Sequence, residues 1–242
     1  MQMEVIMFYP NTIVGIFLSR PNRFLAHVML DGREVVCHVK NTGRLKELLI
    51  PGISVIVQHH PDAAAAGRKT EYSLIKVAKG DVWVNIDSQA PNHVAFEWLN
   101  GLQNTSDHPE FHPQNIRREV RCGDSRFDLS FIDALTGKPW LMEVKGVTLD
   151  VNGTAMFPDA PTERGVKHLN ELAHAAQNGF GAAVLFVIQM KGVFAFSPNT
   201  ERHPAFAEAL KHAREQGVHI LAYDCIVTEN TLQIDQSLPV IL

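Results

Sequence analysis

The sequence is 242 residues long, with 45% hydrophobic and 20% charged residues and a formal net charge of −4 at neutral pH. These values are typical of an ordinary folded protein that is long enough for two small domains. No apolar run in the sequence approaches the length needed to span a bilayer. The first residues, Met1–Glu4, lack the basic segment of a signal peptide, so we expect a cytoplasmic protein that does not bind a membrane.

The charge is distributed unevenly along the chain. Residues 1–80 contain ten Lys and Arg against six Asp and Glu, whereas residues 81–242 contain twelve against twenty. A mildly basic front half is compatible with phosphate binding, and an acidic back half is compatible with carboxylates that hold a metal ion. The three cysteines are widely spaced and include no CxxC pair, which fits neither a disulfide framework nor a zinc site.

The front of the chain, residues 1–80, has the pattern of a small β-barrel. Stretches rich in strand-forming residues are separated by turn signals such as Asp31–Gly32, and a brief helical turn is predicted over 44–49. Five strands with a short helix between the third and fourth are the outline of an OB-fold, which often binds oligonucleotides. The predicted strands cover residues 12–19, 23–30, 33–39, 53–58 and 71–78.

Basic side chains in this barrel and on a later helix are candidate contacts to nucleic-acid phosphates. Arg20 and Arg23 flank a predicted turn, and Arg44 opens the predicted helical turn. Arg164 and Lys167 lie on a helix predicted to begin after Thr162, away from its apolar stripe. For the barrel, the alternative is that the basic residues only keep the domain soluble.

The back half, residues 81–242, alternates helices and strands after a predicted junction at Lys79–Asp81. A central hairpin is followed by a helix and by a nearly continuous apolar strand over 181–190, which is typical of a strand buried on both faces. The order predicts an α/β (α+β) domain with a mixed sheet. Further helices are predicted over 91–103 and 204–216, and further strands over 116–122 and 218–224.

The central hairpin runs from Arg126 to Gly146. A two-residue turn at Thr136–Gly137 would pair Asp128 with Lys145 across the hairpin. Glu143 lies on the same face because side chains in a strand alternate with a period of two residues. Three ionisable groups therefore converge on one face, while the other face points into a core through Leu129, Phe131, Met142 and Val144.

An acid followed by Glu-x-Lys on the neighbouring strand suits the hydrolysis of a phosphodiester. Two carboxylates, here Asp128 and Glu143, offer the hard oxygen ligands that Mg²⁺ prefers. The bound metal polarises the phosphate and lowers the pKa of a bound water. Lys145 can orient that water or stabilise the charge that builds on the phosphate. The alternative is a partly exposed hairpin face that carries an ordinary surface ion pair.

Several short motifs occur along nearly the whole chain. The most specific is the run from Phe157–Ala160 to Lys167–Leu169, and the others are Asn41–Gly43, Val84–Asn85, Asn92, Ser125–Asp128, Glu143–Leu149 and Thr162–Gly165. With these motifs the sequence resembles the sugar fermentation stimulation protein A (SfsA) family of the PD-(D/E)xK nuclease-like superfamily.

The resemblance implies an N-terminal OB-like domain over 1–80 and a nuclease-like domain over 81–242. It also implies DNA binding and a link to the control of maltose and other sugar metabolism. Carried over position by position, it makes Asp128 and Glu143 the ligands of Mg²⁺ or Mn²⁺ and Lys145 the catalytic lysine. Glu97, on the first helix of the second domain, becomes a further candidate ligand.

We therefore expect a DNA-binding protein with a metal-dependent phosphodiesterase site. The alternative is a DNA-binding transcriptional regulator that keeps the nuclease fold without its activity. A sugar-binding protein is a third possibility, which only the family's name suggests. The sequence leaves open DNA or RNA, single or double strand, any sequence preference and the oligomeric state.

Overall fold

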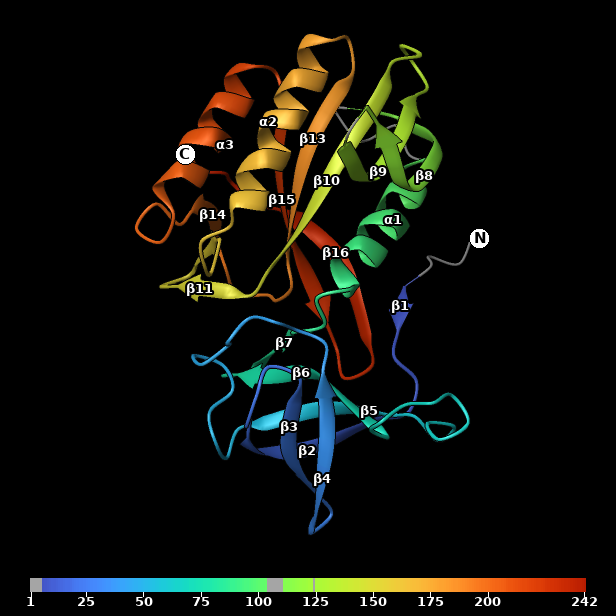
Figure 1. The fold of residues 1–242 in the computed structure, drawn as a ribbon, viewed down its shortest axis with the longest axis vertical. Helices are drawn as coiled ribbons and strands as arrows, with labels where there is room; N and C mark the ends of the chain where they lie inside the picture. The colour runs from blue at the N-terminus through green and yellow to red at the C-terminus, as the bar shows by residue number, and fades with distance from the viewer. Residues whose placement is uncertain (1–5, 104–110, 124) are drawn as a thin grey trace.

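The structure, a computed structural model, describes residues 6–103, 111–123 and 125–242, so the N-terminal residues behind the localisation prediction lie outside it. A β-barrel and a layered α/β part are stacked along the long axis of the molecule (Figure 1). The first strand, β1 (Met7–Phe8), belongs to the layered part, where it pairs with β16 (Thr231–Ser237). Within the described residues, no helix is both long and apolar enough to cross a membrane.

The front barrel is a closed ring of five strands. Antiparallel pairs connect them in the order β4-β3-β2-β5-β6, and a parallel pairing of β4 with β6 closes the ring. Val28, Cys37 and Leu74 point inward and are fully buried, because alternate residues of each strand fill the interior. The predicted OB-like barrel is confirmed. The strands are β2 (Thr12–Ser19), β3 (Leu25–Leu30), β4 (Arg33–Val39), β5 (Ser54–His59) and β6 (Tyr72–Lys79).

The front part contains the predicted turn after β4 and one strand more than predicted. The stretch 44–49 makes a single hydrogen-bonded turn, in which the N–H groups of Leu48 and Leu49 donate to the carbonyl of Leu45, in agreement with the brief helical turn predicted there. Gly80 has a φ of 57° and makes a tight hairpin turn, and β7 (Val82–Asn85) pairs with β6. The chain therefore leaves the barrel sheet after β7 and not at residue 80.

The layered part contains a seven-stranded mixed sheet with helices on both faces. Its strand order is β1-β16-β15-β13-β10-β9-β8, and β13 pairs in parallel with both β10 and β15. Helices α2 and α3 pack on one face and α1 on the other, so that every residue of β13 is buried, as predicted. The elements are α1 (Ala90–Leu102), β8 (Pro113–Cys122), β9 (Ser125–Asp133), β10 (Pro139–Val147), α2 (Glu163–Gln177), β13 (Gly181–Ile188), α3 (Pro204–Glu215) and β15 (His219–Val227).

A small second sheet combines two strands between β10 and α2 with one strand after β13, and none of the three is predicted. It consists of β11 (Leu149–Val151), β12 (Thr154–Phe157) and β14 (Ala195–Pro198), with β12 parallel to β14. Its edge and the following residues up to Thr162 face the barrel loop 41–47 across a cleft.

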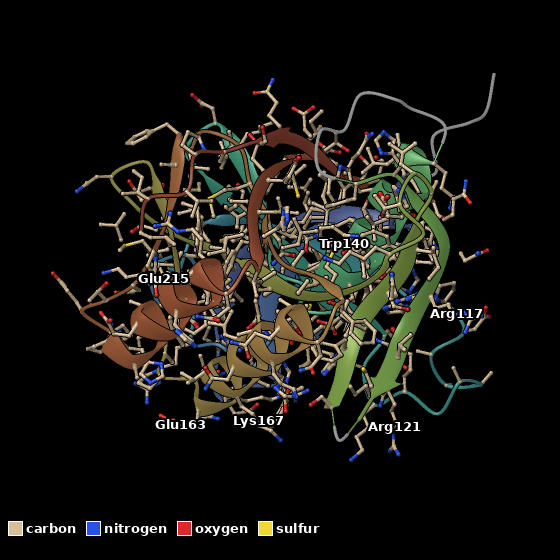
Figure 2. All side chains as sticks on the ribbon, turned by 90° about the horizontal axis from the view of Figure 1, so that it is seen from above. Arg117, Arg121, Trp140, Glu163, Lys167 and Glu215 are labelled. Atoms are coloured by element: carbon tan, nitrogen blue, oxygen red, sulfur yellow. The ribbon has the colours of Figure 1, made fainter. Side chains whose placement is uncertain are left out.

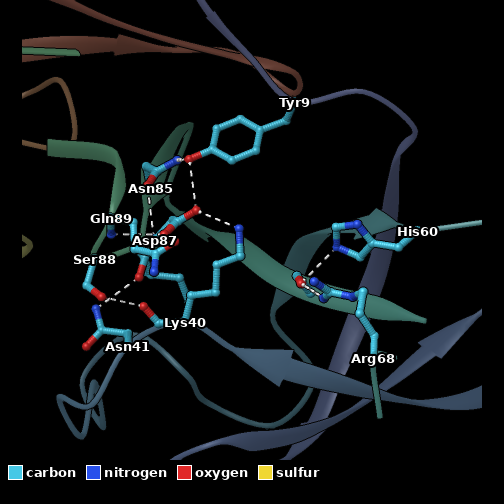
Figure 3. A network of polar contacts seen from close by, with 11 residues as sticks. Tyr9, Lys40, Asn41, His60, Arg68, Asn85, Asp87, Ser88 and Gln89 are labelled. Carbon is cyan, nitrogen blue, oxygen red and sulfur yellow. Dashed lines mark hydrogen bonds and ion pairs between the residues drawn. The ribbon is translucent and has the colours of Figure 1, made fainter. Parts of the chain in front are cut away.

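A buried polar network joins the barrel to the layered part (Figure 3). Asp87, only 1% exposed, accepts hydrogen bonds from Gln89 N (3.0 Å), Lys40 Nζ (3.2 Å) and the Tyr9 hydroxyl (3.4 Å). Asn85 donates to the Tyr9 hydroxyl at 3.1 Å. Since these side chains come from the barrel, from the segment after β1 and from the start of α1, the network fixes three regions of the chain together.

Candidate active site

The site forms where β9 and β10 separate. Their antiparallel ladder ends at the pair Leu129–Met142, which leaves the backbone N–H of Val144 without a partner on the β9 backbone. The carboxylate of Asp128 takes its place: Oδ2 accepts from Val144 N, and Oδ1 accepts from Asn92 Nδ2 on α1, each at 2.8 Å. A side chain thus bridges the gap between the strands, held from both the sheet and the helix.

The register of this hairpin is shifted by two residues from the predicted one. Residues 134–138 connect the strands, and the carboxylate of Asp133 stabilises this loop by accepting bonds from the N–H and the hydroxyl of Thr136 (2.8 and 2.7 Å). The predicted pairing of Asp128 with Lys145 is therefore wrong, and the position opposite Asp128 is Glu143. An even shift leaves every side chain on its predicted face, so the three groups stay together.

Glu143 lies in the centre of the site, with 4% of its side chain exposed. Its Oε1 accepts a hydrogen bond from Lys145 Nζ at 2.6 Å and a second, short one from His168 Nδ1 on α2. Its other oxygen, Oε2, is buried and has no hydrogen-bond partner. A buried acceptor of this kind costs free energy unless a donor or a cation reaches it.

His168 is the residue of the site that the sequence does not reveal as functional. Helix α2 begins at its cap Thr162, whose hydroxyl accepts from Gly165 N at 3.0 Å, and this start aims the side chain at Glu143. Arg164, one turn earlier, donates from Nε to His168 Nε2 at 3.2 Å. Because Nε2 accepts, Nδ1 carries the proton that is donated to Glu143. The sequence signals for His168 are its spacing of four residues from Arg164 and its place in the Lys167–Leu169 motif.

The two carboxylates have different electrostatic surroundings. Burial raises the pKa of Asp128 above its usual range, and the neighbouring charge of Glu143 raises it further. Burial also acts to raise the pKa of Glu143, but the bond from His168 and the charge of Lys145 outweigh it and bring the pKa below its ordinary value. A cation between the two carboxylates would relieve the repulsion that Asp128 experiences.

The residues present fit a divalent cation that keeps part of its water. Asp128 and Glu143 supply hard oxygen atoms, and Oε2 of Glu143 has no other partner. In the described part of the chain, no group of three or more His, Cys, Asp or Glu side chains is arranged to hold a metal ion. The protein therefore offers two carboxylates, and water or substrate oxygens would complete the shell.

Glu97 is not brought to this pair. On α1 its carboxylate bonds His93 Nε2 at 2.9 Å, and the backbone N–H of Met7 in β1 contacts it as well. Burial, the largest effect, raises the pKa of Glu97 in spite of these contacts. Strand β1 is the edge strand at the opposite end of the sheet from β9 and β8, so Glu97 lies several strands away from Asp128.

The five predicted phosphate contacts fall into three groups. The guanidinium of Arg20 donates to four backbone carbonyls of the loops around it, at 2.7 to 2.8 Å, and therefore shapes those loops. Arg23 and Arg44 are exposed and line the cleft between the barrel and the layered part. Arg164 and Lys167 are exposed on α2, where Lys167 forms an ion pair of 3.5 Å with a glutamate of the next turn.

A group of arginines on the β8–β9 ribbon was not predicted to take part in binding. Arg117 and Arg121 point away from the outer strand β8 (Figure 2). Arg118 stacks over the ring of Phe96 at 5.5 Å, and Arg126 forms an ion pair with Glu119. Although residues 81–242 are acidic overall, these arginines form a local basic edge next to Asp128 on β9.

Two family models match the chain. One, described as the sugar fermentation stimulation protein RE domain, covers residues 89–231, and the other, described as the SfsA N-terminal OB domain, covers residues 18–86. Together they span most of the sequence, and the boundary between the two matches falls just after β7.

Similar proteins have the same description. A sugar fermentation stimulation protein homolog from Clostridium beijerinckii is 48% identical over 98% of this chain and 100% of the relative. One from Desulfitobacterium hafniense strain Y51 is 51% identical over 94% of this chain and 95% of the relative. The solved structure of Pyrococcus furiosus SfsA in complex with Ca²⁺ is similar over 100% of both chains, with a TM-score of 0.83 and 28% identity.

Proposed function

The chain belongs to the sugar fermentation stimulation protein (SfsA) family, and we propose that it binds nucleic acid and hydrolyses phosphodiesters with the help of Mg²⁺ or Mn²⁺. The observation that carries this proposal is Oε2 of Glu143, buried without a partner on the face that also holds Asp128 and Lys145. That the Pyrococcus furiosus relative was solved with Ca²⁺ supports a divalent ion in this family.

Each residue has a distinct task in the proposed reaction. Asn92 and the N–H of Val144 hold the carboxylate of Asp128, and His168 holds that of Glu143, so the ligands are positioned before the ion arrives. When bound, the ion would polarise the phosphate and lower the pKa of a coordinated water. Lys145, 16% exposed, can turn from Glu143 toward the phosphate and stabilise the charge that develops on it.

Nucleic-acid binding is proposed to depend on phosphate contacts. Arg23 and Arg44 on the barrel side and Arg164 and Lys167 on α2 supply exposed positive charge on two sides of the carboxylate pair. Affinity should then fall steeply with added salt, because bound counterions are released when the protein neutralises phosphates. We also propose a cytoplasmic location. The family description supports a role in sugar metabolism.

The test is a cleavage assay on labelled DNA and RNA with Mg²⁺, Mn²⁺ or a chelator. Cleavage should require the ion, Asp128→Ala should abolish it, and Lys145→Ala should slow it by ~10²-fold while the ion still binds. The matched control is Asp81→Ala, which removes an exposed carboxylate of the barrel hairpin and should leave the rate unchanged. If wild type binds DNA but cuts neither nucleic acid with any ion, the protein is the inactive regulator and the enzymatic proposal is wrong.

A further inference from the structure

A cleft of about 890 Å³ lies between the barrel and the layered part. One wall is the barrel loop 41–47, and the other consists of residues 146–149 and 156–162. Gly146, which directly follows Lys145, is part of the lining. The cleft therefore begins at the end of β10 that carries the candidate catalytic residues.

The rim of this cleft is positively charged. Four cations line it against two carboxylates, Glu47 and Asp159, although the layered part as a whole is acidic. The four cationic side chains are exposed, and none of them forms an ion pair with a described carboxylate. They are Arg23, Arg44, Lys46 and Arg202. Unpaired cations around a concave site attract an anionic ligand.

A buried amide lies inside the cleft. Gln189 is 2% exposed, and its Oε1 has no hydrogen-bond partner. A side chain at Gly146 would strike the ring of Pro91 at 2.6 Å and approach the Gln189 amide at 3.2 Å, so the glycine allows Pro91 and Gln189 to pack closely against the end of β10. A buried amide oxygen without a partner is satisfied by a ligand that supplies a hydrogen-bond donor. The edges of unpaired nucleobases carry such donors, which a glutamine side chain can accept.

The spacing connects the cleft to the proposed reaction. Gly146 is three residues beyond Glu143, about 10 Å along a strand that rises roughly 3.3 Å per residue. At the duplex rise of roughly 3.4 Å per nucleotide this is about three nucleotides, and a more extended single strand covers it with fewer. A nucleic-acid chain with one phosphate at Glu143 would therefore reach the cleft with a nearby nucleotide. A cavity of this volume is of the size that holds a small ligand, which suits a single strand rather than a duplex.

We propose that this cleft binds an unpaired nucleotide of a single-stranded nucleic acid, a few positions from the phosphate that is cleaved. Arg23, Arg44, Lys46 and Arg202 hold its phosphates, and Gln189 contacts the edge of its base. The proposal rests on the proposed nucleic-acid function and adds the substrate class: a single strand or a single-stranded end.

The test measures binding without catalysis. A short fluorescein-labelled single-stranded oligonucleotide and a hairpin duplex of the same composition are titrated with the full chain in EDTA at low salt, followed by anisotropy. The single strand should bind at least about tenfold more tightly than the duplex. Arg44→Glu and Arg202→Glu should each weaken single-strand binding about tenfold and reduce the salt slope by about one. Lys69→Glu, the same change on an exposed barrel residue outside the cleft, should leave binding unchanged.

Gln189→Leu tests the base contact separately. It should reduce the differences in affinity among homopolymers of the four bases and leave the salt slope unchanged, because it removes no charge. Equal affinity for duplex and single strand, or equal effects of Arg44→Glu and Lys69→Glu, would overturn the proposal. Because EDTA prevents metal-dependent cleavage, these results are independent of the catalytic proposal. If the cleft variants weaken binding but no cleavage occurs in the assay with metal, only the enzymatic proposal is wrong. If cleavage occurs but the cleft variants bind as wild type does, only the cleft proposal is wrong.

Discussion

Two buried carboxylate centres of this protein differ in how completely their oxygens are bonded. At the junction network, both oxygens of Asp87 accept hydrogen bonds, from Gln89 N, Lys40 and Tyr9. In the candidate active site, Oε2 of Glu143 is buried without a partner, and the charge of Glu143 acts against Asp128. Both oxygens of Asp87 are hydrogen-bonded within the protein, and this network holds the barrel to the layered part. Oε2 of Glu143 has no such partner, so the candidate active site requires a cation or a donor from a ligand.

The largest expected effect is at the junction. Asp87→Ala should lower the free energy of unfolding by about 3 kcal/mol, because it leaves Lys40 and the Tyr9 hydroxyl without their acceptor in a buried place. Urea unfolding followed by circular dichroism measures this. Asp81→Ala, an exposed carboxylate on the neighbouring hairpin turn, should change the value by less than about 0.5 kcal/mol. Equal values for the two variants would remove the contrast between the two centres.

A pH dependence should follow from Lys76, which also joins the two parts. Its Nζ donates to the carbonyls of Thr228, Glu229 and Thr231 at 2.8, 3.1 and 3.1 Å, and burial lowers its pKa from 10.5 to about 7. Between these two values the unfolded chain holds a proton that the folded chain has released. Raising the pH through this window therefore stabilises the fold, by up to about 1.4 kcal/mol per pH unit.

The same urea titrations, repeated from pH 7 to pH 10 on wild type and Lys76→Met, measure this slope. The variant has no side-chain proton to release at this position, so its curve should lack the rise, and the other lysines and tyrosines cancel in the difference. If the free energy of unfolding changes with pH in the same way for wild type and Lys76→Met, the pKa of Lys76 is the same in the folded and the unfolded chain.

The smallest expected effect on stability concerns Asp128 in the candidate active site. In metal-free protein, Asp128→Asn should raise the free energy of unfolding by about 1 kcal/mol, because it removes a carboxylate that burial and Glu143 disfavour. Thermal unfolding in EDTA measures the change, and Asp128→Asn should lose the stabilisation that added Mn²⁺ gives wild type. A loss of stability comparable to that of Asp87→Ala would show that Asp128 serves the fold rather than a ligand.

Periodicity and turn signals were sufficient to predict the barrel and the mixed sheet, because both depend on local alternation of apolar residues. The predicted pairing of Asp128 with Lys145 was wrong, but Asp128, Glu143 and Lys145 still share one face, since a shift of two residues preserves the face. The contact of His168 with Glu143 depends on how α2 packs against the sheet, which no local pattern encodes. Likewise, only the fold reveals that Arg20 donates to four backbone carbonyls and that the side-chain oxygen of Gln189 has no donor.

The most direct test of the central claim is a calorimetric titration of the metal-free protein with Mn²⁺. Wild type and Asp81→Ala should each bind an ion with the same affinity, and Asp128→Ala and Glu143→Gln should each weaken that binding by at least about tenfold, because each removes one charged ligand oxygen. Binding that survives unchanged in both site variants, or that is absent from wild type, would contradict the assignment of the unpartnered Glu143 oxygen to a metal ion.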